Sequence, residues 1–219
     1  WYARSRPRLH LVWASGNDYR PFNRAVLELL DIRNPAIFVD RPVRVDRLHV
    51  PSVGYRIRDA ASPQHLAFMA AWADSRAGSD RAGPRVWLSR AALPPHKGRV
   101  VQEEEIIEIL RSNGWTIFAP ERRSLGEQLQ MLAGASHVAG FMGSAFHTLM
   151  LLREFRGRIT MFSRGAVNEN FQTIARMRGF DQTIIEPPLE RVAGDGAAAK
   201  WALADISAVL SPLGISSYD

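Results

Sequence analysis

The segment PRVWLSR (residues 84–90) opens a run of short apolar stretches that decides the fold. Three similar segments follow: RVVQEEE (residues 99–105), GWTIFAPE (residues 114–121) and SHVAGFMGSA (residues 136–145). Polar or glycine residues stand in each of them where an apolar strand ends or a helix begins. In open α/β sheets such positions surround ligands that carry phosphates. This order of motifs therefore predicts a phosphate-binding site.

Strands and helices are expected to alternate from residue 85 onward. The apolar stretches predict strands at 85–89, 115–119, 136–141, 158–162 and 183–185. Amphipathic stretches predict helices at 102–113, 124–135, 144–155, 168–178 and 197–210. Short apolar strands that alternate with helices indicate a doubly wound parallel sheet of the Rossmann type.

The first part of the chain predicts a smaller α/β unit. A strand at 9–14, a helix at 21–31 and a strand at 36–39 form a βαβ start, and residues 42–53 alternate as an exposed strand pair would. The small polar run at 77–83 is the best linker in the chain. We therefore expect two domains, residues 1–78 and 84–219, the first of them beginning in mid-domain.

Composition limits the class of protein. The 219 residues are 46% hydrophobic and 23% charged, as in soluble globular proteins, and include no cysteine, which excludes disulfides, cysteine-bound zinc and thiol catalysis. The apolar run 149–152 is too short for a membrane span of about 20 residues. The net charge of +6 comes almost wholly from arginine, which suits phosphate and carboxylate geometry. A GC-rich genome explains that usage equally well, so nucleic acid, anionic lipid and nucleoside diphosphates remain open as partners.

Two arginines are candidates for holding a diphosphate. Ser89 and Arg90 directly follow a predicted buried strand and therefore lie at the edge of the sheet where ligands bind. Arg90 alone is equally well explained as a surface residue. The loop 91–98, with two prolines and a glycine, brings Arg99 back near the start of the next helix. Two convergent guanidinium groups favour the binding interpretation.

The acidic residues nearby divide into structural and functional candidates. Glu104, within the run 103–105, is explained by the dipole of the helix that begins there. Glu127 forms a capping box with Ser124. Gln128 has no such local role. Neither has Glu121, whose carboxylate follows a proline and can accept hydrogen bonds from ribose hydroxyls or remain a solvated loop group.

A glycine turn joins the next strand and helix. Gly140, Gly143, Ser144 and Ala145 allow backbone amides to approach a phosphate at a helix N-terminus. The turn lacks the lysine of a Walker loop and the third glycine of the dinucleotide pattern, so alone it is weak evidence. His147 fits a core or surface position. The histidines are scattered and no Asp-x-Asp occurs, which predicts a site without metal.

Taken in order, these motifs resemble the bacterial branch of glycosyltransferase family 61, which includes capsular and exopolysaccharide transferases. The resemblance rests on Ser89-Arg90, Arg99-Val-Val-Gln-Glu-Glu-Glu105, Gly114-Trp115 with Pro120-Glu121, Glu127-Gln128, Ala135 and Gly140-Phe-Met-Gly-Ser144. Toward the N-terminus it continues weakly through Trp1 and Pro7-Arg8-Leu9. It covers almost the whole of a transferase domain.

The resemblance implies a GT-B-like enzyme with two Rossmann-type halves, the second of which binds the donor. Such an enzyme moves a sugar from a nucleotide sugar, with UDP among the candidate carriers, to a glycan or lipid-linked acceptor, with inversion and without metal or cofactor. Its context is bacterial surface polysaccharide synthesis, on the cytoplasmic side and peripheral to the membrane, with no nucleic-acid partner. The expected donor-binding residues are Ser89, Arg90, Arg99, Glu121, Gln128, Gly140, Gly143, Ser144 and Ala145. The catalytic base, donor sugar, acceptor and linkage stay open.

Three departures from the family pattern keep other functions open. Met142 stands where a histidine is usual, Gln102 where asparagine is usual, and Arg4 where an acidic residue is common. A thioether can neither carry a proton nor donate a strong hydrogen bond. A non-catalytic domain that binds a nucleotide sugar or glycan is therefore the second hypothesis. A nucleic-acid-binding domain is the third, and the chain lacks the aromatic motifs and basic helix that it would need.

Overall fold

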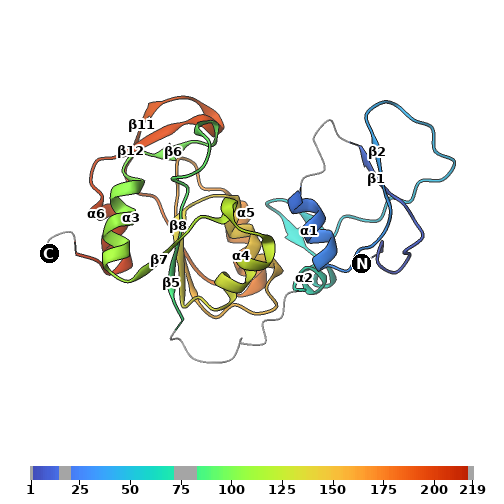
Figure 1. Ribbon diagram of the computed structural model, residues 1–219, viewed down its shortest axis with the longest axis horizontal. Coiled ribbons are helices and arrows are strands. Elements are labelled where there is room, and N and C mark those ends of the chain that lie inside the picture. The colour runs from blue at the N-terminus through green and yellow to red at the C-terminus, as the bar shows by residue number, and fades with distance from the viewer. Residues whose placement is uncertain (1, 15–20, 72–82, 217–219) are drawn as a thin grey trace.

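A five-stranded parallel sheet forms the centre of the structure (Figure 1). The computed structural model describes residues 2–14, 21–71 and 83–216. The strands lie in the order β10-β9-β8-β5-β7, and all neighbours run parallel. They are β5 (Arg85–Leu88), β7 (Trp115–Phe118), β8 (His137–Phe141), β9 (Arg158–Phe162) and β10 (Asp181–Ile185). The predicted α/β class with a parallel sheet is confirmed.

Helices cover both faces of this sheet (Figure 1). Val86 and Leu88 pack into one apolar layer, whereas Trp87 between them packs into the other, because successive side chains of a strand point to opposite faces. Strands buried on both faces must be apolar throughout, which is why they stand out in the sequence. The helices are α3 (Glu103–Ser112) and α6 (Ser207–Leu210) on one face, and α4 (Leu125–Ala133), the 3₁₀ helix η3 (Ser144–Leu151) and α5 (Glu169–Arg178) on the other.

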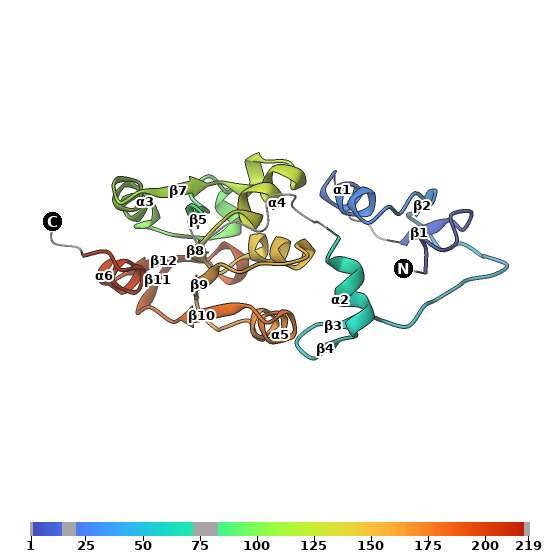
Figure 2. The same cartoon turned by 90° about the horizontal axis from the view of Figure 1, so that it is seen from below.

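The strand order creates a crevice between β5 and β8. The chain passes from β5 outward to β7, returns to the other side of β5 as β8, and then continues outward through β9 and β10 (Figure 2). The helices that follow β5 and β8 therefore lie on opposite faces, and the loops at the carboxyl ends of these two strands separate. Ligands of doubly wound sheets bind at this reversal point.

A smaller set of elements lies beside the α4 and α5 face (Figure 1). β1 (Leu11–Ala14) pairs in parallel with β2 (Ala36–Val39) across α1 (Pro21–Leu29), which confirms the expected βαβ start. β3 (Tyr55–Arg56) and β4 (Ala60–Ala61) form an antiparallel pair before α2 (Pro63–Met69). Apolar residues of both helices pack against the α4 and η3 layer: Ala25, Val26, Leu29 and Met69.

The expected C-terminal helix at 197–210 is wrong. The segment begins in the short 3₁₀ helix η4 (Gly196–Ala198), continues as the strand β12 (Lys200–Leu203), and is α-helical only at its end, in α6. β12 lies between β11 (Leu189–Ala193) and β6 (Arg99–Val100) in a second, three-stranded sheet. The amide side chain of Gln102 fixes this strand, because it donates to the Leu203 carbonyl at 2.9 Å and accepts from the Leu203 amide at 3.0 Å.

Two further predictions fail, and one cannot be examined. Residues 42–53 contain no strand; this segment carries Pro42 and Pro51, which have no backbone donor, and it remains exposed. The helix expected at 144–155 is the shorter 3₁₀ helix η3. The expected linker at 77–83 lies outside the described residues except for Gly83, so the division into domains 1–78 and 84–219 stays a prediction. In the described part of the chain, no helix combines the length and the apolar character of a membrane span.

His137 at the start of β8 gives the sheet a pH-dependent component of stability. Burial, followed by the charges of Arg158 and Arg85, lowers the pKa of His137 to about 4, and its ring bonds Thr160 Oγ1 at 2.9 Å. The unfolded chain takes up this proton near pH 6.5 and the folded chain only near pH 4, so stability is lost as pH falls through that window.

From pH 7 to pH 4, we expect the free energy of unfolding of the wild type to fall by about 1–2 kcal/mol relative to that of His137→Gln, a value that allows for partial solvent screening. Urea unfolding across that range measures it. A difference independent of pH would contradict the assignment.

Candidate active site

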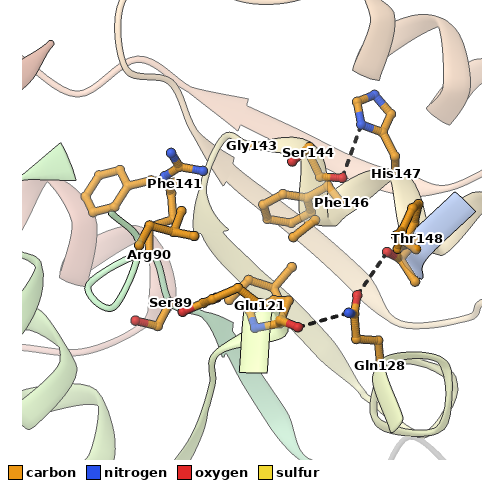
Figure 3. Close-up of a pocket in the computed structure, with 15 residues that line it drawn as sticks. Ser89, Arg90, Glu121, Gln128, Phe141, Gly143, Ser144, Phe146, His147 and Thr148 are labelled. Atoms are coloured by element: carbon orange, nitrogen blue, oxygen red, sulfur yellow. Dashed lines mark hydrogen bonds between the residues drawn. The ribbon is translucent and has the colours of Figure 1, made fainter. Parts of the chain in front are cut away.

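A cavity of about 400 Å³ opens at the crevice between the carboxyl ends of β5 and β8 (Figure 3). Its volume lies within the range of about 300–1,000 Å³ typical of small-molecule sites. The lining residues are Phe22, Leu88, Ser89, Arg90, Leu93, Pro120, Glu121, Gln128, Phe141, Gly143, Ser144, Ala145, Phe146, His147 and Thr148. Most residues predicted to bind a donor are therefore brought together here.

Arg90 crosses one end of the cavity. Its backbone amide donates to Glu103 Oε1 at 2.7 Å, and its Nη2 donates to the Lys97 carbonyl at 2.8 Å. Burial lowers the pKa of Arg90, and the carboxylates of Glu103 and Glu121 oppose this effect. Figure 3 shows the guanidinium group beside Gly143. A half-buried cation in this position can bind an anion.

Gly143 keeps the backbone open beneath that guanidinium. A Cβ atom at this position would lie 2.5 Å from Arg90 Nη1, closer than any ordinary contact. Ser144 and Ala145, which also line the cavity, begin η3. The first amides of a helix have no partner within it, so they are suited to bind phosphate oxygens.

Gln128 and Glu121 lie on the opposite wall. Gln128 Nε2 donates to the Pro120 carbonyl at 2.9 Å and to the Arg123 carbonyl at 3.1 Å, while its oxygen accepts from Thr148 Oγ1 at 3.3 Å (Figure 3). These bonds engage the whole amide, so Gln128 fixes the turn that carries Glu121. Glu121 itself is exposed and forms no hydrogen bond or ion pair with another described residue.

The structure does not bring Arg99 and Gly140 into the cavity. Arg99 lies on β6 in the second sheet, where it pairs with Lys200 of β12, and it is not among the residues that line the cavity. Gly140 lies within β8, and a Cβ atom there would lie 2.8 Å from the Leu88 carbonyl oxygen. The absence of a side chain at Gly140 permits close strand packing, whereas the sequence pattern predicts that this glycine gives a phosphate access to the backbone.

Sequence reasoning missed Glu103, which is only 1% exposed. Besides the Arg90 amide, its Oε1 accepts from the Trp87 indole at 3.4 Å, and Oε2 has no hydrogen-bond partner. Burial raises the pKa of Glu103, and the two hydrogen bonds act against this. Its spacing from Ile106, Ile107 and Leu110 on the buried face of α3 could have revealed it.

Arg164 was also missed. It follows β9 as Arg90 follows β5, and Ser163-Arg164 is the second Ser-Arg pair that comes directly after an apolar strand, which the sequence alone could have shown. Its Nε and Nη2 donate to the Met142 carbonyl at 3.4 and 3.3 Å. Burial, together with the charge of Arg90, lowers the pKa of Arg164 to about 10. A second cation thus adjoins the glycine turn.

His147 lines the cavity but has both ring nitrogens engaged. Nδ1 bonds the Ser144 carbonyl at 3.2 Å, and Nε2 bonds Asn170 Nδ2 at 2.9 Å. The ring stacks on Phe171 with centroids 4.6 Å apart, and burial lowers the pKa of His147. Tyr55 bonds the same Asn170 side chain, so His147 links η3 to α5 and β3. Among the described residues, no three His, Asp or Glu side chains gather as a metal site would require.

Gly140, within β8, and Gly143, in the turn after it, form a matched pair for mutation. Gly140→Ala places a methyl group against fixed backbone, so we expect a loss of about 1–3 kcal/mol in the free energy of unfolding. Gly143→Ala meets only the end of the Arg90 side chain, which can move, so the loss should stay below about 1 kcal/mol. Chemical denaturation of both variants measures this. Equal losses, or the reverse order, would contradict the described packing.

A known protein family matches most of the chain. The sequence profile of Glycosyltransferase 61 matches residues 3–157, which is more than half of the chain. This range contains β5, β7, β8 and every residue that lines the cavity. No curated protein matches the chain by sequence. The chain belongs to glycosyltransferase family 61.

Proposed function

We propose that this protein transfers a sugar from a nucleotide-sugar donor to a glycan acceptor, and that the cavity between β5 and β8 binds the donor. One observation carries the proposal: in a chain of glycosyltransferase family 61, the Arg90 guanidinium lies over Gly143 at the point where doubly wound sheets bind phosphates. Sugar transfer from such a donor releases a diphosphate. Fixed positive charge beside the departing phosphate stabilises the transition state.

The proposed reaction is an inverting displacement that needs no metal ion. The acceptor hydroxyl attacks the anomeric carbon as the bond to the diphosphate breaks, and a general base takes its proton. Of the acidic and histidine side chains that line the cavity, Glu121 alone is unengaged, because both His147 nitrogens are bonded. We assign the base to Glu121. The charge on the leaving group is balanced by Arg90 and by the first amides of η3.

The wider context is proposed from the family. We infer a GT-B arrangement in which residues 1–78 contribute to an acceptor-side half and residues 84–219 form the donor-side half. Bacterial surface polysaccharide synthesis, such as capsule assembly, is the proposed pathway, with UDP among the candidate carriers. Nucleotide sugars are made in the cytoplasm, which favours that compartment, at the inner face of the membrane where lipid-linked acceptors lie.

A second candidate is a domain of the same fold that binds a nucleotide sugar or glycan without turnover. Two observations favour it: Met142 cannot carry a proton, and His147 is committed to structural bonds. Nucleoside diphosphate binding, without nucleotide release in the presence of any acceptor, would identify this function.

Arg90 can be tested against Arg99, the arginine that the structure leaves outside the cavity. Thermal shift measurements with UDP, GDP, CMP and dTDP should show stabilisation of the wild type by at least one nucleotide. Arg90→Ala should abolish that shift, corresponding to at least about tenfold weaker binding, and Arg99→Ala should retain it. A retained shift in Arg90→Ala would overturn the placement of the donor.

Glu121 can be tested through the split between turnover and affinity. Removal of a general base typically costs about 10²–10⁴ in rate, so Glu121→Gln should lower kcat by that factor and leave nucleotide affinity nearly unchanged. Nucleotide release and calorimetric titration measure the two quantities. Weaker nucleotide binding at normal kcat would instead show that Glu121 holds the ribose.

A further inference from the structure

Arg90 and Arg164 are two half-buried arginines without an ion pair in the described part of the chain. The arginines that do form ion pairs there are all at least half exposed, as are their partners. Charges removed from water are normally paired, because desolvation of an isolated charge is costly. Arg178 is a third half-buried arginine without an ion pair, but it lies away from the cavity. The feature that requires an explanation is therefore that Arg90 and Arg164 lie next to each other.

The two guanidinium groups reach the same two loops. Arg90 Nη1 lies over Gly143, and Arg164 donates to the carbonyl of the preceding residue, Met142. On the other side, Arg90 Nη2 bonds the Lys97 carbonyl, and a Cβ atom on Gly98 would lie 3.3 Å from Arg164 Nη1. Both side chains thus span the space between the glycine turn and the turn at residues 97–98.

The sheet order produces this convergence. β8 lies between β5 and β9, so the Ser-Arg pairs that follow β5 and β9 flank the turn that follows β8. Ser89 and Ser163 are buried at corresponding positions, and their amides bond the carbonyls that end β7 and β10. Neighbouring strands lie about 4.8 Å apart, so β5 and β9, with β8 between them, are about 10 Å apart. Two arginine side chains that follow these strands can therefore reach one ligand.

Neither guanidinium is neutralised by a direct ion pair with another described residue. Glu103 is the buried carboxylate beside both arginines, but its Oε1 binds the Arg90 amide and the Trp87 indole, and it forms an ion pair with neither guanidinium. Glu103 acts on both cations and the exposed Glu121 acts on Arg90, while the repulsion between the two guanidinium groups contributes to the lowered pKa of Arg164. An anionic ligand between the two arginines would offset this repulsion.

We propose that Arg90 and Arg164 form a clamp for the diphosphate of the donor, in which Arg164 is a substrate-binding residue. The clamp rests on the proposed function for the identity of its ligand. Arg164 lies beyond residues 3–157, the segment that matches the family, and it is not among the residues that line the cavity. It extends the binding site from the cavity, past Arg90, to the loop that follows β9. Two forked cations on either side of one turn suit two linked phosphates better than one.

The test compares diphosphate and monophosphate ligands. Calorimetric titrations with UDP, UMP, GDP, GMP, inorganic pyrophosphate and inorganic phosphate give the preference for a diphosphate in each variant. Arg164→Gln should weaken binding of pyrophosphate and of the nucleoside diphosphate at least about tenfold, with a smaller effect on the monophosphates. Arg164→Lys should retain part of the preference. Arg178→Gln is the matched control, because Arg178 is another partly buried arginine, bonded to the Leu152 carbonyl away from the cavity.

The outcomes separate the clamp from the proposed function. A folded Arg164→Gln variant with an undiminished diphosphate preference overturns the clamp, and if that variant does not fold, the same result with Arg164→Lys does so. Sugar transfer by the wild type that persists unchanged in these variants also overturns the clamp but supports the function. Pyrophosphate binding that depends on Arg164, without nucleotide release from any donor, supports the clamp and contradicts the transferase. A wild type that binds neither pyrophosphate nor nucleotide overturns both.

Discussion

The close approach of β8 to β5 at Gly140 is the constraint on which the site depends. No side chain fits there, since a Cβ atom would lie 2.8 Å from the Leu88 carbonyl oxygen. β5 and β8 are the neighbouring strands at which the sheet reverses its winding, so the helices that follow them cover opposite faces and the loops at their carboxyl ends separate. The cavity opens between those loops. Its position therefore follows from strand packing as much as from the polar residues.

Burial and charge then give the cavity its chemical character. The buried Glu103 carboxylate fixes the backbone at Arg90 by accepting a hydrogen bond from its amide. On the opposite wall of the cavity, the side-chain amide of Gln128 fixes the turn that carries Glu121. One wall is thus cationic and the other carries a free carboxylate. That separation suits a reaction in which an anion leaves on one side while a proton is taken up on the other.

The sequence predicted the central sheet well because strands buried on both faces must be apolar throughout. Ser89, Arg90, Glu121 and Gly143 were predicted from their place at strand ends alone. The segment 197–210 predicts a helix because an alanine run at 197–199 opens it, whereas the strand β12 that follows this run is fixed by Gln102, which lies 101 positions before Leu203. Such long-range hydrogen bonds leave no local pattern. Arg164, by contrast, does have a local pattern, because the pair Ser163-Arg164 follows an apolar strand just as Ser89-Arg90 does.

A crystal structure of the complex would show whether a nucleoside diphosphate binds between the carboxyl ends of β5 and β8. Crystals grown with the nucleoside diphosphate that gives the largest thermal shift would place both phosphates. We expect phosphate oxygens within hydrogen-bond distance of the Arg90 guanidinium and of the backbone amides at Ser144 and Ala145, with the Arg164 guanidinium on the outer phosphate. A nucleotide bound elsewhere on the protein, with Arg90 still directed at the Lys97 carbonyl alone, would contradict this expectation.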